Sequence, residues 1–171
     1  MTASTNSKPK DAKDAKPPAK PSAGHKRLNV WLGKWNTTGQ QHEGPVGPAA
    51  KIVAIDIYEW LTGEFFMVHR FDGKVGDNDA SCIEITGYDP ETKSYPTHTY
   101  YNTGLANDWQ SVERDGTWTL TGDWDMAGKK AKARCTTVFS HDGNTMVGKW
   151  EMSIDGGAWQ TFWDIKATKA K

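Results

Sequence analysis

Residues 32–40 read LGKWNTTGQ and have the form of the first strand of a β-barrel. Gly33 lets the backbone bend close to its neighbours, and Trp35, two residues later, offers a large apolar ring system with one N–H that needs a partner when buried. We therefore predict that Gly33 and Trp35 are structural residues, with Trp35 at the floor of the barrel. The same Gly-x-Trp spacing returns at residues 122–124 and 148–150.

The chain that follows divides into short segments with the composition of strands. Nine tryptophans, five tyrosines and five phenylalanines supply much of the apolar surface, and aromatic residues favour strands. Strands are expected at about 33–42, 51–60, 65–71, 80–88, 95–102, 107–114, 117–125, 131–140, 145–153 and 159–168. The connections are short, so neighbouring strands must be antiparallel. The predicted fold is all-β, a single up-and-down antiparallel barrel of about ten strands that closes and leaves no free edge.

A leader and a short helix are expected before the first strand. Residues 1–24 are rich in Lys, Ala and Pro and contain no aromatic residue, Val, Ile or Leu, so burial cannot offset the entropy of ordering them. We predict that this leader is disordered and that the barrel domain spans residues 25–171. Leu28, Trp31 and Leu32 follow helical i, i+3, i+4 spacing, which predicts a short helix capping one end of the barrel.

Charge and cysteine content restrict the possible partners and location. The chain carries 21 basic and 21 acidic side chains, but its first 27 residues hold seven Lys or Arg and only two Asp, which leaves the remainder mildly acidic. Nucleic-acid binding by the barrel is therefore not expected. No apolar run reaches membrane-spanning length, and the N-terminus lacks the apolar core of a secretory signal. Cys82 and Cys135 are expected to be free thiols in a cytoplasmic protein.

Alternation along the strands predicts which side chains point into the barrel. In 117–125 the even-numbered residues form the apolar face, and in 145–153 Trp150 lies on the apolar face. In 65–71 the odd-numbered residues do so. The predicted ligand-binding residues are Phe65, Met67, His69, Phe71, Trp118 and Trp150. Alternation leaves the facing of four strands undecided, those at about 51–60, 80–88, 95–102 and 107–114.

His69 is the only histidine that falls on a predicted apolar inner face. It fits three roles, namely a hydrogen bond to a ligand, acid–base catalysis and haem ligation. The alternative is a core histidine bonded to a neighbouring hydroxyl or carbonyl group. No HxH, CxxC, HExxH, GxGxxG or GxSxG motif occurs, so no metal site, phosphate cradle or serine nucleophile is predicted. If the protein has a catalytic residue, His69 is the candidate.

Four segments together resemble a bacterial family of small lipocalin-like proteins catalogued as a domain of unknown function. They are YEWLTGEFFMVHRFD at 58–72, IEITGYDP at 83–90, DGTWTLTG at 115–122 and DGNTMVGKWE at 142–151. The resemblance covers about residues 28–169. It implies a barrel but brings no established activity and no catalytic residue.

The Gly-x-Trp opening is more distantly similar to lipocalins, fatty-acid-binding proteins and the haem-binding nitrobindins. The chain departs from each of these groups. It lacks a secretory signal, it has no Arg-x-Tyr carboxylate clamp near its C-terminus, and where nitrobindins place a haem-ligating histidine on a late strand it has only His141 in a turn. No haem or other cofactor is therefore expected.

Three hypotheses for function follow. The first is binding of a small, largely apolar or aromatic molecule inside the barrel, with His69 as the best single polar contact. The second is a barrel enzyme of the cyclase or isomerase kind, in which His69 transfers a proton within an apolar cavity. The third is a filled barrel that serves as a scaffold or interaction module. Each is compatible with a monomer or a homodimer that binds neither nucleic acid nor membranes.

Overall fold

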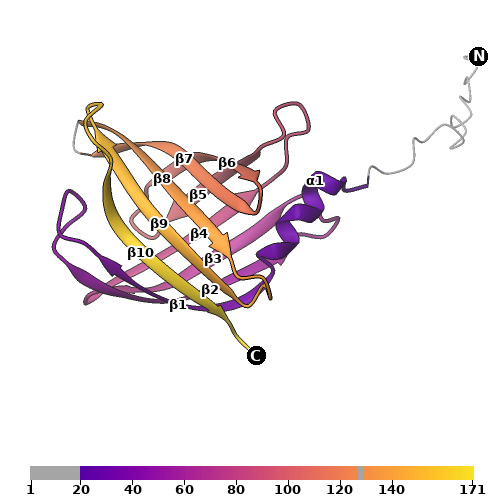
Figure 1. The fold of residues 1–171 in the computed structure, drawn as a ribbon, viewed down its shortest axis with the longest axis horizontal. Coiled ribbons are helices and arrows are strands. Elements are labelled where there is room, and N and C mark those ends of the chain that lie inside the picture. The colour runs from indigo at the N-terminus through magenta and orange to yellow at the C-terminus, as the bar shows by residue number, and fades with distance from the viewer. Residues whose placement is uncertain (1–19, 127–128) are drawn as a thin grey trace, which may run out of the picture.

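Ten antiparallel strands close into a barrel in the computed structural model, which describes residues 20–126 and 129–171 (Figure 1). The strands are β1 (Gly33–Gln41), β2 (Ala50–Trp60), β3 (Met67–Val75), β4 (Asn78–Thr86), β5 (Tyr95–Tyr101), β6 (Ala106–Arg114), β7 (Thr117–Met126), β8 (Lys129–Phe139), β9 (Thr145–Ile154) and β10 (Gln160–Lys169). Each strand pairs with its neighbours in sequence, and β1 pairs with β10 to close the ring. The predicted up-and-down barrel is confirmed.

The third strand begins later than predicted. It starts at Met67 rather than at residue 65, because the loop after β2 runs from Leu61 to Phe66. The Leu61 N–H donates to the Phe66 carbonyl at 2.9 Å, and the Glu64 N–H donates to the Leu61 carbonyl at 2.9 Å. This loop therefore includes Phe65, which the sequence places on an inner strand face.

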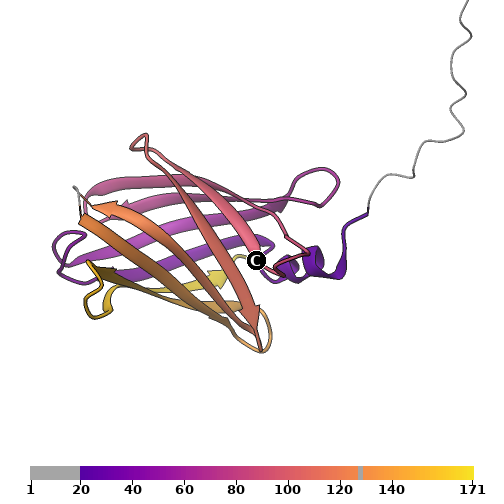
Figure 2. The same cartoon turned by 90° about the horizontal axis from the view of Figure 1, so that it is seen from above.

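A helical segment closes one end of the barrel (Figure 2). It consists of α1 (Ala23–Lys26) and the 3-10 helix η2 (Arg27–Val30). The predicted capping helix is therefore present, but it starts at Ala23, inside the leader predicted to be disordered, and ends before Trp31. Residues 1–19 of the predicted leader lie outside the described residues. Leu28 is buried against Met67, Tyr95 and Trp118, and this contact fixes the helical segment to the strands.

Trp35 links the helical cap to the first strand. Its side chain is fully buried, at 0 % exposure, and packs against Phe139, Met146 and Ala167. Its Nε1–H donates to the Trp31 carbonyl at 2.7 Å, which satisfies the polar atom of the buried indole. The indole therefore lies at the capped end of the barrel.

The local structure explains why glycine occupies two of the Gly-x-Trp triplets. Gly33 adopts φ = +113° where the chain turns from the cap into β1, a region that residues with a Cβ rarely occupy. At Gly122 an added Cβ would lie 2.5 Å from a ring carbon of Trp109. The absence of a side chain at Gly122 lets the Trp109 indole pack across β7 inside the barrel.

On two of the four undecided strands, β2 and β4, a carboxylate points into the barrel. On β2, Asp56 is buried while Ile55 and Ile57 are 39 % and 37 % exposed. On β4, Glu84 lines the interior while Ile83 is exposed. The inner face of β2 therefore combines Asp56 with the buried Ile52 and Ala54, while isoleucines next to both carboxylates point outward.

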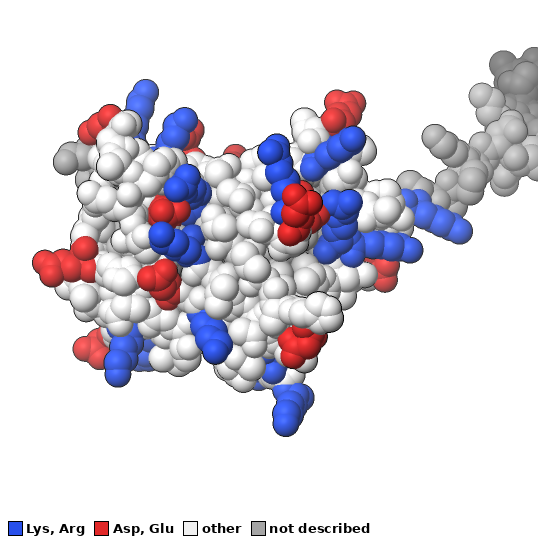
Figure 3. Space-filling model, in the orientation of Figure 1, with Lys and Arg blue, Asp and Glu red and all other residues white. Residues whose placement is uncertain are grey.

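The outer surface carries charges of both signs. On the face shown in Figure 3, Lys and Arg side chains are interspersed with Asp and Glu side chains. Within residues 20–126 and 129–171, no helix has the length and apolar character needed to cross a membrane.

Candidate ligand-binding site

A cavity of about 560 Å³ occupies the interior of the barrel. It runs from Leu28 and Trp31 beneath the helical cap to Val46 and Leu105 in loops at the opposite end. Leu105 is 62 % exposed, so the cavity reaches solvent-exposed residues at that end. Its aromatic lining consists of Trp31, Tyr58, Phe71, Tyr95, Tyr101, Trp109, Trp118, Trp124, Trp150, Phe162 and Trp163.

Five of the six predicted ligand-binding residues line this cavity. They are Met67, His69, Phe71, Trp118 and Trp150. Phe65 does not line it, and its predicted inward position is wrong. Because Phe65 belongs to the loop before β3, its ring instead makes an edge contact with the His25 ring, with centroids 5.3 Å apart. The binding role of the other five remains a prediction.

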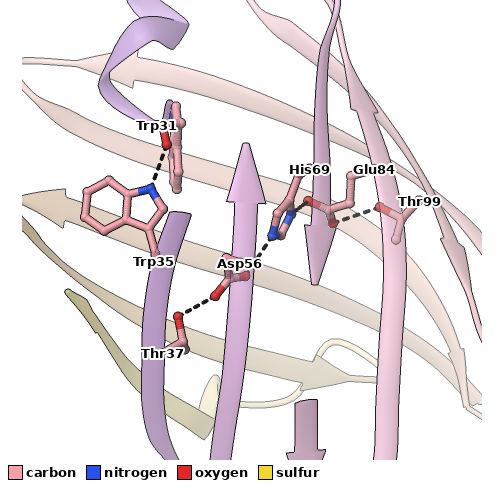
Figure 4. A network of polar contacts seen from close by, with 7 residues as sticks. All are labelled: Trp31, Trp35, Thr37, Asp56, His69, Glu84 and Thr99. Atoms are coloured by element: carbon pink, nitrogen blue, oxygen red, sulfur yellow. Dashed lines mark hydrogen bonds and ion pairs between the residues drawn. The ribbon is translucent and has the colours of Figure 1, made fainter. Parts of the chain in front are cut away.

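A row of polar side chains crosses the cavity wall from β1 to β5 (Figure 4). His69 is at its centre, with Nε2 2.7 Å from Asp56 Oδ1 and Nδ1 2.7 Å from Glu84 Oε2. The Thr37 hydroxyl donates to Asp56 Oδ2, and the Thr99 hydroxyl donates to Glu84 Oε1 at 3.0 Å. Each carboxylate therefore accepts one hydrogen bond from His69 and one from a threonine.

Strand register explains why these residues meet. His69 on β3 lies directly opposite Glu84 on β4, and Glu84 lies opposite Thr99 on β5. On the other side, His69 lies opposite Tyr58 on β2, two residues along the same face from Asp56. Directly opposed side chains on one face of a sheet approach each other closely. Antiparallel pairing thus brings one imidazole between two carboxylates.

The electrostatics of this row favour a charged histidine. Burial alone would lower the pKa of the His69 imidazole, but the charge of Glu84 and the hydrogen bonds to Asp56 and Glu84 outweigh burial and raise that pKa to about 9. Burial would raise the pKa of Glu84, whereas the charge and hydrogen bond of His69 hold it below its usual value. At neutral pH both ring nitrogens of His69 therefore carry protons and donate to carboxylates.

This protonation limits the chemistry available to His69. An imidazolium with both N–H groups engaged has no lone pair with which to accept a proton. It therefore cannot act as a general base in this state.

The predicted partners of His69 are corrected by the structure. A core histidine is expected to bond to a hydroxyl or carbonyl group, but both partners are carboxylates. The Tyr58 ring stacks on His69 with centroids 4.0 Å apart and an interplanar angle of 4°. His69 is thus in contact with Asp56, Glu84 and Tyr58 on three sides.

Several residues of this site are missed by the sequence patterns. Asp56, Glu84 and Asn107 lie on strands whose facing alternation leaves undecided. The available signal is a carboxylate between two apolar residues, as in Ile55-Asp56-Ile57 and Ile83-Glu84-Ile85. In such a triplet either the carboxylate or its two apolar neighbours can point into the barrel. The pattern alone therefore does not decide which of them faces the interior.

The cavity also contains two thiols and two unpaired donors. Cys82 and Cys135 are free cysteines, and burial raises the pKa of Cys135 to about 12, so its thiol stays uncharged. Asn107 Nδ2 and Trp109 Nε1 are buried cavity-lining atoms without a hydrogen-bond partner among the described residues. Within the same residues, no group of three His, Cys, Asp or Glu side chains is arranged to hold a metal ion.

The same fold occurs among solved structures, and two of them illustrate it. The crystal structure of Rv2717c from M. tuberculosis matches with a TM-score of 0.63 and 10% sequence identity, over 88% of this chain and 99% of that one. The S-type phycobiliprotein lyase CPES from Guillardia theta matches with a TM-score of 0.60 and 13% identity, over 85% and 92% of the two chains. Identities this low establish similarity of fold alone. The comparison with curated proteins finds no match.

The family relationship rests on the sequence itself. The family described as "Protein of unknown function (DUF1579)" has a sequence model that matches residues 20–169, which is most of the chain. The match confirms the family of unknown function that the four sequence segments predict, and the ten-stranded barrel confirms its lipocalin-like fold. The chain therefore belongs to the DUF1579 family.

Proposed function

We propose that this protein binds a small, largely apolar or aromatic molecule inside its barrel. The observation that carries the proposal is the interior cavity of about 560 Å³, whose aromatic walls include one row of polar side chains. Ligand sites have this character, since they are mostly apolar, contain a few placed polar groups and measure roughly 300–1,000 Å³. A barrel that acts only as a scaffold has no need of such a space.

The comparisons give this proposal modest support. One structural neighbour is named a phycobiliprotein lyase, so a barrel of this fold serves a protein that acts on another molecule. The fold therefore suits ligand binding, while the choice of ligand depends on the residues of this chain.

A proton-transfer enzyme is the weaker candidate. His69 donates from both ring nitrogens, so it becomes a general base only if a substrate separates it from Asp56 or Glu84. We also propose a cytoplasmic location, in keeping with the two free thiols, and a monomer or homodimer that binds neither nucleic acid nor membranes.

Binding of a neutral apolar dye tests the proposed function. N-phenyl-1-naphthylamine should bind one molecule per barrel and quench tryptophan fluorescence, because several indoles line the cavity. Leu120→Trp enlarges a cavity-lining residue on β7 and should weaken binding by about tenfold or more, which corresponds to about 1.4 kcal/mol.

Val147→Trp is the matched control, since Val147 lies on β9 and is 49 % exposed. This variant should bind the dye like the unmodified protein. Equal dye affinity in the Leu120 and Val147 variants would place the bound dye outside the cavity and contradict the proposed function.

A further inference from the structure

The charges that line the cavity do not balance. Asp56 and Glu84 supply two carboxylates, and the imidazolium of His69 lies between them. The remaining charged lining residue is Asp79 at the end opposite the cap, where it is exposed and pairs with Lys74 at 3.2 Å. No Lys or Arg side chain lines the cavity among the residues that the structure describes. Two buried carboxylates therefore share one imidazolium, which leaves a net negative charge in the interior.

Burial makes this imbalance significant. The side chain of Asp56 is 7% exposed and that of Glu84 is 20% exposed, so water screens these carboxylates poorly. Each of their oxygens already accepts one hydrogen bond, yet a carboxylate oxygen has room for a second. Buried charge without a counter-charge is unfavourable, and a bound cation would offset it.

The aromatic walls favour the same kind of ligand. Tryptophan rings attract cations through the negative potential over their faces, and several indoles line the cavity. Burial raises the pKa of Tyr58 and Tyr101, so both phenols stay neutral and add no negative charge. Organic cations in an aromatic enclosure gain from both effects.

A second observation concerns two buried hydrogen-bond donors in the cavity wall. Trp109 is 3 % exposed, and within residues 20–126 and 129–171 its Nε1–H meets no acceptor in hydrogen-bonding geometry. Asn107 Nδ2 also has no partner in this part of the chain, and Asn107 lies directly opposite Thr99, at the end of the polar row. Buried donors without partners are uncommon in folded proteins, so an acceptor on a ligand is a natural partner for them.

Building on the proposed function, we propose that the cavity selects an organic cation, a protonated amine on an aromatic or alkyl body that also carries a hydrogen-bond acceptor. The ammonium group lies beside Asp56 and Glu84, and the acceptor faces Asn107 and Trp109. Carboxylic acids of the same size are disfavoured, because they would place a further negative charge beside these two side chains.

Three dansyl probes that differ only at the end of a five-carbon chain test this inference. Dansyl cadaverine ends in an ammonium group, N-hexyl dansylamide ends in a methyl group, and N-dansyl-6-aminohexanoic acid ends in a carboxylate. All three carry sulfonyl oxygens that can accept from Asn107 and Trp109. Fluorescence titration at neutral pH should find the ammonium probe bound about tenfold or more tightly than the neutral probe, and the carboxylate probe bound most weakly.

Variants assign the effect to the polar row. Glu84→Gln and Asp56→Asn keep the side-chain shape and remove one charge each, so each should reduce the ammonium-to-neutral affinity ratio several-fold. Glu59→Gln is the control, since it removes a carboxylate from the exposed face of β2, and should leave that ratio unchanged. Asn107→Leu should weaken all three probes while preserving the ratio. Far-UV circular dichroism checks that each variant is folded.

The outcomes separate this inference from the proposed function. If none of the three probes binds, the proposed function itself is contradicted. If the neutral or carboxylate probe binds as tightly as the ammonium probe to the unmodified protein, the cavity binds ligands but the selection of a cation is wrong. This comparison needs no variant, so it decides the matter even if Glu84→Gln and Asp56→Asn fail to fold.

Discussion

Replacing His69 with phenylalanine should lower the free energy of unfolding by about 3–5 kcal/mol, the range found when one partner of a buried ion pair is removed. The substitution keeps a planar ring that can still stack on Tyr58. It leaves Asp56 and Glu84 facing each other inside the barrel, each with one threonine hydroxyl as its remaining side-chain donor. Urea unfolding followed by tryptophan fluorescence measures the loss.

A histidine on the outer face provides the control. His98 bonds to Asp108 on the surface, where its side chain is 57% exposed, so His98→Phe should change stability by less than about 1 kcal/mol. A similarly small effect of His69→Phe would show that the row from Thr37 to Thr99 is not held together by the charge on His69.

The same row predicts a dependence of stability on pH. The pKa of His69 rises from 6.5 to about 9 on folding, so its stabilising contribution is complete below pH 6.5 and is lost as the pH rises through about 9. Glu84 behaves in the opposite sense, since its lowered pKa adds stability that is lost only as the pH falls through that lowered value. The difference in unfolding free energy between the unmodified protein and His69→Phe should therefore shrink between pH 6.5 and about 9. A difference that stays constant or grows over this interval contradicts the protonated state of His69.

Replacing Trp35 with alanine should cost about 3–5 kcal/mol of unfolding free energy, as for other large aromatic residues removed from a core. The indole is fully buried, and its loss opens a void beside Phe139, Met146 and Ala167. It also removes the hydrogen bond to the Trp31 carbonyl, which joins the cap to β1. Chemical denaturation of the variant measures the loss.

Trp159 is the matched control for Trp35. It is 40 % exposed and its ring lies under the Arg134 guanidinium at 4.3 Å, so Trp159→Ala should cost less than about 1 kcal/mol. If Trp35→Ala also costs less than about 1 kcal/mol, the segment at residues 32–40 does not organise the barrel.

The order of strands could be read directly from the chain. Loops of Gly, Asp and Asn interrupt the strands at regular intervals, and a chain of short connections can form only antiparallel neighbours. Asp115 and Gly116 show this locally, because both adopt positive φ, at +51° and +79°, in the hairpin between β6 and β7. The apolar spacing of Leu28 and Trp31 likewise marks the cap. These features depend on near neighbours in sequence, so pattern reasoning reaches them.

The polar row at the centre of the site depends on the closed barrel. His69 lies 13 residues from Asp56 and 15 from Glu84, and only strand register places the three in contact. Alternation assigns a face when one side of a strand is clearly more apolar than the other. On β2 the exposed Ile55 and Ile57 make the outer face apolar next to the inward Asp56, so neither face is clearly the more apolar one. The sequence therefore does not decide which face of β2 points inward. Local pattern therefore determined the strands and their order, whereas barrel closure, a long-range property, decided which polar groups share the cavity.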